Sequence, residues 1–115
     1  MPISDTLKNT ATIGVTEFSL PQNAAYSAAS PRVDDCIAQT FVDFSAMAAG
    51  DEYLVAAYEK ANAGTQAPFM RWYLSGVQSE LFVSPMFILT EGWDFTVKKI
   101  AGTDRSIKWS VRQVT

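Results

Sequence analysis

The chain has 115 residues, a length typical of one domain, with nine Lys and Arg against twelve Asp and Glu and a net charge of −3. Nucleic-acid binding needs a concentrated basic face, so this balance argues against a nucleic-acid partner. Charged residues make up only 18%, below the share usual in soluble domains. We interpret the shortage as a surface that partly faces other protein, the alternative being a surface of Ser, Thr, Gln and Ala.

The sequence contains no histidine and one cysteine, Cys36. These counts exclude Ser–His and Cys–His nucleophiles, His-ligated metals, thiolate clusters and an internal disulfide. We therefore expect a protein that is not an enzyme, that needs no metal or cofactor, and that buries the Cys36 thiol. No apolar run is long enough to span a membrane, and residues 1–5 do not resemble a signal peptide, so we expect no membrane partner.

Proline and glycine recur along the whole chain, between short stretches rich in β-branched and aromatic residues. Residues 1–10 are expected to form a flexible N-terminal arm, and residues 21–31 a long polar loop. Strands are expected over 10–20, 36–44, 51–63, 68–77, 81–90 with a break at Ser84–Pro85, 93–98 and 107–112. The pattern predicts an all-β fold, with residues 11–115 forming a single antiparallel β-sandwich of about seven or eight strands, jelly-roll or Ig-like.

Residues 51–63 fit two structures. As a helix, Asp51 would be the cap, Gly64 would follow the end, and an apolar stripe would run along one side. As a strand, Tyr53 and Val55 would share a face. We predict a strand because the neighbouring segments read as strands, although the Ala-rich stretch 54–57 is unusual for one.

The alternation of residues 93–98 and 107–112 predicts an antiparallel hairpin with one buried and one water-facing side. Ala-Gly-Thr occurs at 63–65 and at 101–103. We interpret both as hairpin turns in which glycine adopts a positive φ, rather than as a faded repeat.

Candidate catalytic groups are few. The adjacent acids Asp34–Asp35 and Asp51–Glu52 would point to opposite faces of a strand, so they are expected to be solvated charges. A hydrolase whose paired acids come from distant segments stays a minor alternative. No calcium-binding loop or phosphate-binding motif is present.

Three tryptophans, Trp72, Trp93 and Trp109, lie in predicted strands, where core packing is expected over stacking on a base or a sugar. Candidate interaction residues lie in loops. Asp104 and Arg105 at the predicted hairpin tip fit a protein contact or a polar turn equally well. Tyr26 and Arg32, in the loop after Pro21, are candidates for contacts with neighbouring subunits, as is the arm.

The C-terminal half resembles small β-sandwich structural proteins of tailed bacteriophages. The similarity covers about residues 41–114 and is carried by Val83-Ser84-Pro85, the run Glu91-Gly92-Trp93-Asp94-Phe95-Thr96-Val97-Lys98-Lys99 and the run from Ala101 to Arg112. Gly50-Asp51-Glu52-Tyr53, Tyr58-Glu59-Lys60 and Gly64-Thr65-Gln66 fit the same pattern. No catalytic residues come with this family.

The resemblance implies a virion protein on the capsid surface, assembled in the host cytoplasm. Such proteins include capsid cement or decoration proteins, which bind the major capsid protein as dimers or trimers. The expected function is therefore capsid cement. The alternative is a tail, connector or fibre component that binds a receptor or carbohydrate, which would require tryptophans at the surface.

Overall fold

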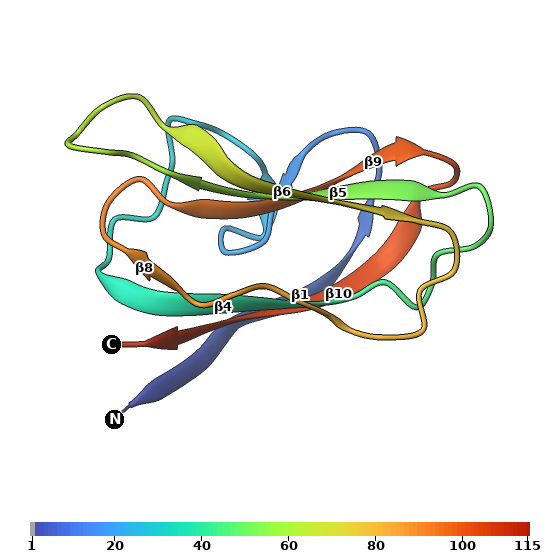
Figure 1. Cartoon of the computed structure of the whole chain (residues 1–115), viewed down its shortest axis with the longest axis horizontal. Helices are drawn as coiled ribbons and strands as arrows, with labels where there is room; N and C mark the ends of the chain where they lie inside the picture. The colour runs from blue at the N-terminus through green and yellow to red at the C-terminus, as the bar shows by residue number, and fades with distance from the viewer. Residues whose placement is uncertain (1) are drawn as a thin grey trace.

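The structure is a computed structural model that describes residues 2–115. It confirms the predicted all-β sandwich: these residues contain no helix, and ten strands form two antiparallel sheets (Figure 1). The number exceeds the expected seven or eight because three strands have only two residues each. The strands are β1 (Ile3–Ile13), β2 (Phe18–Ser19), β3 (Ala24–Ala25), β4 (Cys36–Asp43), β5 (Glu52–Glu59), β6 (Ala67–Ser75), β7 (Phe82–Val83), β8 (Phe87–Leu89), β9 (Asp94–Ala101) and β10 (Arg105–Val114).

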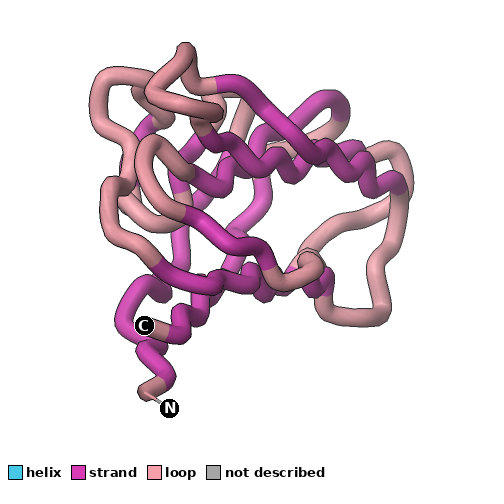
Figure 2. Tube along the Cα trace, turned by 60° about the vertical axis from the view of Figure 1, so that its left-hand side comes forward, coloured by secondary structure: helices cyan, strands magenta, loops and turns pink. Residues whose placement is uncertain are grey.

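The two sheets have different strand orders and lie over each other. Sheet A has the order β1-β10-β4-β7, with β8 also paired to β4, and sheet B has the order β3-β2-β9-β5-β6. Figure 2 shows both layers from a second direction, with strands in magenta. On one long side, the β6 edge of sheet B lies over β7 and β8 of sheet A. The ring centroids of Trp72 and Phe82 are 5.2 Å apart there, and those of Phe69 and Phe87 are 4.9 Å apart.

The core between the sheets is built from alternate residues of the facing strands. In β4, Cys36, Ala38 and Val42 point inward, as the alternation predicts, and the Cys36 thiol is buried. Trp93 and Trp109 are also buried, which confirms the prediction of core packing for them, and Trp72 packs partly buried against the core. The largest fully buried side chains are Trp93, Tyr53, Phe44, Phe95, Ile13, Leu20, Leu89 and Ile107.

The predicted hairpin of residues 93–98 and 107–112 is wrong. β9 pairs with β2 and β5 in sheet B, whereas β10 pairs with β1 and β4 in sheet A. The short connection 102–104 crosses between the sheets, and Gly102 turns it with a φ of 93°. Alternation indicates that a strand buries one side, but it does not identify the neighbouring strand. The predicted wet side of β9 is also wrong at its start, because Asp94 and Thr96 are buried.

The predicted N-terminal arm is instead part of a strand from Ile3 onward. β1 pairs with β10 along its length, from Ile3 opposite Val114 to Ile13 opposite Arg105, with a bulge between Ser4 and Leu7. The polar side chains that suggested an arm face water at this edge of the sheet, while Leu7 packs on the core. The strand expected over 10–20 is consequently divided between β1 and β2.

Residues 51–63 contain a strand and no helix, as predicted. β5 lies between β6 and β9, so both of its edges are paired, and its residues from Tyr53 to Ala57 are all buried. The predicted break at Ser84–Pro85 separates β7 from β8, and the Ser84 hydroxyl accepts a hydrogen bond of 2.9 Å from the backbone N–H of Thr40. Residues 21–31 form a loop as expected, apart from the two residues of β3.

Only one Ala-Gly-Thr segment lies in a hairpin turn. Residues 63–65 belong to the turn between β5 and β6, where Asn62 and Ala63, not Gly64, have positive φ. Residues 101–103 lie at the crossing between the sheets.

Candidate functional site

The outer face of sheet A carries an exposed apolar surface. Ile3 lies opposite Val114, Val114 opposite Ile37, and Ile37 opposite Ile88, so four aliphatic side chains form one row across β1, β10, β4 and β8. Ile3 is 70% exposed and Ile88 is 83% exposed. The outer face of sheet A is the surface made by this row together with Phe41, Val83 and Met86.

Met86 and Arg112 border a groove in this apolar surface, and the charged side chains Lys8, Lys108 and Asp43 lie on the other half of the same side of the sheet. A groove of about 290 Å³ is lined by Ile3, Ile37, Met86 and Arg112, and Met86 is 68% exposed. The Arg112 guanidinium lies 3.8 Å from the ring centroid of Phe41, a cation–π contact. Its nearest carboxylate is Asp5, with 4.0 Å between Nε and Oδ1. The guanidinium is therefore held in place and still has donors for a partner.

The β6 edge is the second apolar surface, defined here by residues 69–74. Phe69, Met70 and Tyr73 are exposed on it, and Tyr73 is 63% exposed. Ala57 pairs with Met70 and Tyr58 with Pro68, so Phe69 is the extra residue of a β-bulge.

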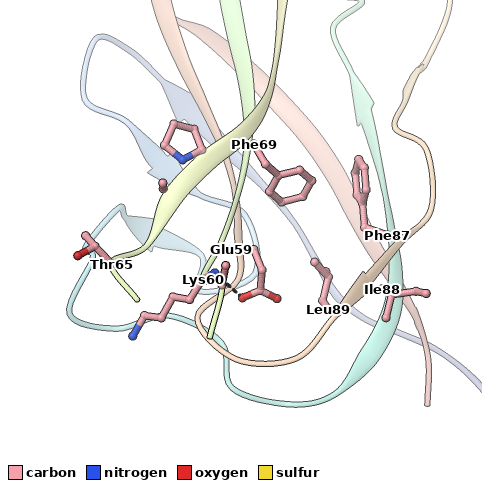
Figure 3. Close-up of a pocket in the computed structure, with 10 residues that line it drawn as sticks. Glu59, Lys60, Thr65, Phe69, Phe87, Ile88 and Leu89 are labelled. Carbon is pink, nitrogen blue, oxygen red and sulfur yellow. Dashed lines mark hydrogen bonds between the residues drawn. The ribbon is translucent and has the colours of Figure 1, made fainter. Parts of the chain in front are cut away.

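A groove of about 450 Å³ opens between the start of the β6 edge and β8. The bulge aims Phe69 at Phe87, and Leu89 and Ile88 line the far wall (Figure 3). Glu59 accepts hydrogen bonds from the backbone N–H groups of Lys60 and Thr90, so its carboxylate is occupied. The groove therefore presents mainly apolar walls.

Tyr26 and Arg32 lie at one end of the sandwich. The Tyr26 ring stacks on that of Tyr58 with centroids 4.8 Å apart, and its hydroxyl donates 2.6 Å to Gln66. Arg32 donates to Asp34 at 3.0 Å and lies 5.6 Å from the ring centroid of Trp93. Both side chains are half-buried and engaged within the chain, and their contact with neighbouring subunits stays a prediction.

The connection from β9 to β10, at the right of Figure 1, contains Asp104 and leads into Arg105, the first residue of β10. Arg105 Nε donates 2.7 Å to Asp51, which is buried, and Asp104 accepts 2.6 Å from Lys99 Nζ. Arg105 therefore ties two loops together, and Asp104 is the more exposed of the two. The four candidate residues do not form one surface, and their role in interactions stays a prediction.

One pair of acids from distant segments comes together on the outer face of sheet B. Glu17 accepts 2.6 Å from the Tyr58 hydroxyl and 2.5 Å from Thr96, and Asp94 accepts 2.7 Å from Ser19. Burial raises the pKa of Asp94 to about 6. Asp94 is only 1% exposed, so its carboxyl does not reach a substrate in this conformation.

The sequence contained a signal for the outer face of sheet A. In the segment 36–44, Ile37 and Phe41 fall on the side opposite Cys36, Ala38 and Val42, so both sides of that strand are apolar. The row completed by Ile3 and Ile88 depends on strand pairing, which alternation does not reveal.

Within residues 2–115, no group of three or more His, Cys, Asp or Glu side chains is placed to hold a metal ion. That part of the chain also has no helix long and apolar enough to cross a membrane. No protein-family model, curated protein or solved structure matches the chain.

Proposed function

We propose that the chain is a virion structural protein, most concretely a capsid cement protein that binds across subunits of the major capsid protein through the outer face of sheet A. The observation that carries the proposal is the row of aliphatic side chains from Ile3 to Ile88, in which Ile3, Ile37 and Ile88 are exposed and Val114 is half-buried. The resemblance of residues 41–114 to phage structural proteins supports the same function.

An exposed apolar row of this kind favours a docking surface over an ordinary protein surface. Side chains on the water-facing side of an antiparallel sheet are usually polar, and large contiguous apolar patches mark interaction sites. The central side chains of the row, Val114 and Ile37, come from paired strands, so backbone hydrogen bonds hold their backbones in place. A backbone that is already ordered loses little conformational entropy on binding.

The chemistry of this face supports a protein partner with a matching apolar surface. The apolar row would contact an apolar strip on the shell, and Arg112 at its border would pair with a carboxylate or backbone carbonyl there. Repeating one modest interface at every symmetry-related position of a shell gives stable attachment without catalysis.

The carbohydrate-binding alternative has less support. It requires tryptophan rings at the surface, and the indole N–H groups of Trp93 and Trp109 instead donate to the backbone carbonyls of Asp34 and Leu20 inside the domain, each at 3.0 Å. A sugar would therefore find no ring of these two residues to stack on. This is the reason for preferring the cement function over receptor or glycan binding.

The proposal is tested by cosedimentation of the purified chain with shells assembled without it. Ile88→Asp places a charge in the exposed row at little cost to folding, and we expect at least a tenfold loss of affinity. Val15→Asp is the matched control, because Val15 is 71% exposed and lies between β1 and β2, away from this face. Circular dichroism checks that both variants fold. Shells that bind no wild-type chain, or that bind Ile88→Asp as well as wild type, would overturn the proposal.

A further inference from the structure

The strand edge formed by β6 is long, and Pro68 and the bulge at Phe69 protect only its start. β6 has nine residues and ends sheet B, whereas β3 at the other end of that sheet has two. The long edge β1 of sheet A is covered by polar and charged side chains such as Asp5, Lys8 and Thr10. Proteins normally protect edges with such residues, because unpaired backbone groups recruit another strand. The β6 edge instead exposes Phe69, Met70 and Tyr73, with Arg71 as its one charge.

We propose that β6 pairs antiparallel with β6 of a second copy of this chain, about a two-fold axis that passes through Trp72. The inference rests on the proposed function and deepens it, since it names the partner of the surface that the shell does not use. Pairing two identical edges joins the two copies of sheet B into one continuous sheet and leaves no β6 edge free.

Symmetry restricts the register to a few choices. Directly opposed residues of an antiparallel pair lie on the same face of the sheet. The two-fold axis must therefore pass midway between the two copies of one residue, which then oppose each other. An axis at Arg71 would oppose two guanidinium groups. An axis at Trp72 opposes Arg71 and Tyr73 on the outer face, twice, as cation–π pairs. On the inner face the same axis opposes Met70 and Leu74, an apolar pair, and places the two copies of Trp72 opposite each other.

Neighbouring parts of the same side extend the contact. The turn after β6 contains Val77, which is exposed and lines a groove together with Leu74 and Leu81. In the register centred on Trp72, the end of each β6 lies beside the start of the other, where Phe69 and the groove in Figure 3 are located. The exposed apolar side chains of this turn are therefore brought next to the partner's apolar groove.

The oligomeric state is measured by light scattering on a sizing column at increasing concentration. The wild-type chain is expected to run as a dimer. Arg71→Glu should raise the dissociation constant at least tenfold, and the double variant Arg71→Glu/Tyr73→Lys should restore the dimer by opposing a carboxylate and an ammonium. Lys98→Glu, on β9 away from the edge, is the control and should leave the dimer intact.

Disulfide trapping tests the register. The double variant Arg71→Cys/Tyr73→Cys should give an oxidised dimer, and each single variant should not, because position 71 opposes position 73. A chain that stays monomeric, or efficient cross-linking by Arg71→Cys alone, would overturn the inference. A monomer that still binds shells would overturn only the dimer, and a dimer that fails to bind shells would overturn only the cement function.

Discussion

The hydroxyl of Ser19 donates a hydrogen bond of 2.7 Å to Oδ1 of Asp94, while Oδ2 of the same buried carboxyl has no partner within residues 2–115. Ser19 belongs to β2 and Asp94 to β9, so the contact joins neighbouring strands on the outer face of sheet B. A buried polar atom without a partner costs stability, and the cost is largest when the group is charged.

Asp94→Asn is expected to stabilise the protein at pH 7 by about 2 kcal/mol, because it removes the buried charge and keeps the acceptor for Ser19. The folded-state pKa of Asp94 is raised, to about 6, by burial, so the folded chain binds more protons than the unfolded chain below that pH. The contribution of Asp94 to the free energy of unfolding is therefore present at acid pH and is lost as the pH rises from about 4 to about 6. Urea unfolding at pH 4.5 and pH 7 measures the difference.

The matched control for that variant is Asp35→Asn, because Asp35 is an exposed acid on the same chain. It should change stability little at either pH. Equal stability of wild type and Asp94→Asn at pH 7 would show that the carboxyl carries no burial cost.

Asp51→Asn should lower stability at neutral pH. The hydrogen bond from Arg105 is the main reason that the pKa of Asp51 lies well below its usual range. Hydrogen bonds from the backbone N–H groups of Ala48 and Thr103 lower the pKa further. A depressed pKa means that stability is present above the ordinary pKa of Asp and lost as pH falls below it. Thermal melts at pH 7 and pH 3 should therefore differ less for the variant than for wild type. Asp104→Asn, at a more exposed pair, should change the melting temperature little.

Gly102→Ala should destabilise far more than Gly50→Ala. Both glycines have positive φ, 93° and 91°, so each variant pays a backbone cost of about 1 kcal/mol. A Cβ at position 102 would also lie 2.2 Å from the Asp51 carboxylate, whereas one at position 50 meets nothing within 4 Å. We expect a loss of at least about 3 kcal/mol for Gly102→Ala. If urea unfolding showed equal losses of stability for the two variants, the close packing of Gly102 against Asp51 would be contradicted.

Tryptophan fluorescence should be blue-shifted and unchanged by added glycans, because Trp93 and Trp109 are enclosed in the core. Emission measured in the presence of a panel of mono- and oligosaccharides provides the check. Quenching that saturates with one sugar would favour the receptor-binding alternative over cement.

Local features of this fold could be predicted from the sequence, and pairing could not. The break at Ser84–Pro85 and the strand β5 follow from local chemistry and neighbouring segments. The alternation in β9 and in β10 predicts that the two strands pair, yet the three residues after Ala101 lead the chain from one sheet to the other. Alternation reports burial, whereas the partner of a strand depends on contacts between distant segments.

The same limit applies to the candidate site. The two apolar sides of the segment 36–44 are visible in the sequence, but the row across sheet A needs Ile3, Val114 and Ile88 to be brought beside Ile37. The loop position of Tyr26 and Arg32 predicts contacts with other subunits, whereas both side chains make contacts within the chain. The proposed docking surface rests on the exposure of apolar strand residues, not on the polarity of loops.

The most direct measurement is a cryo-electron microscopy reconstruction of virus particles that carry the chain. The account predicts density for this domain at regular positions over the shell, with the row from Ile3 to Ile88 against the capsid protein and β6 against β6 of a second copy. Density confined to the tail, or a shell contact made through the outer face of sheet B, would contradict it.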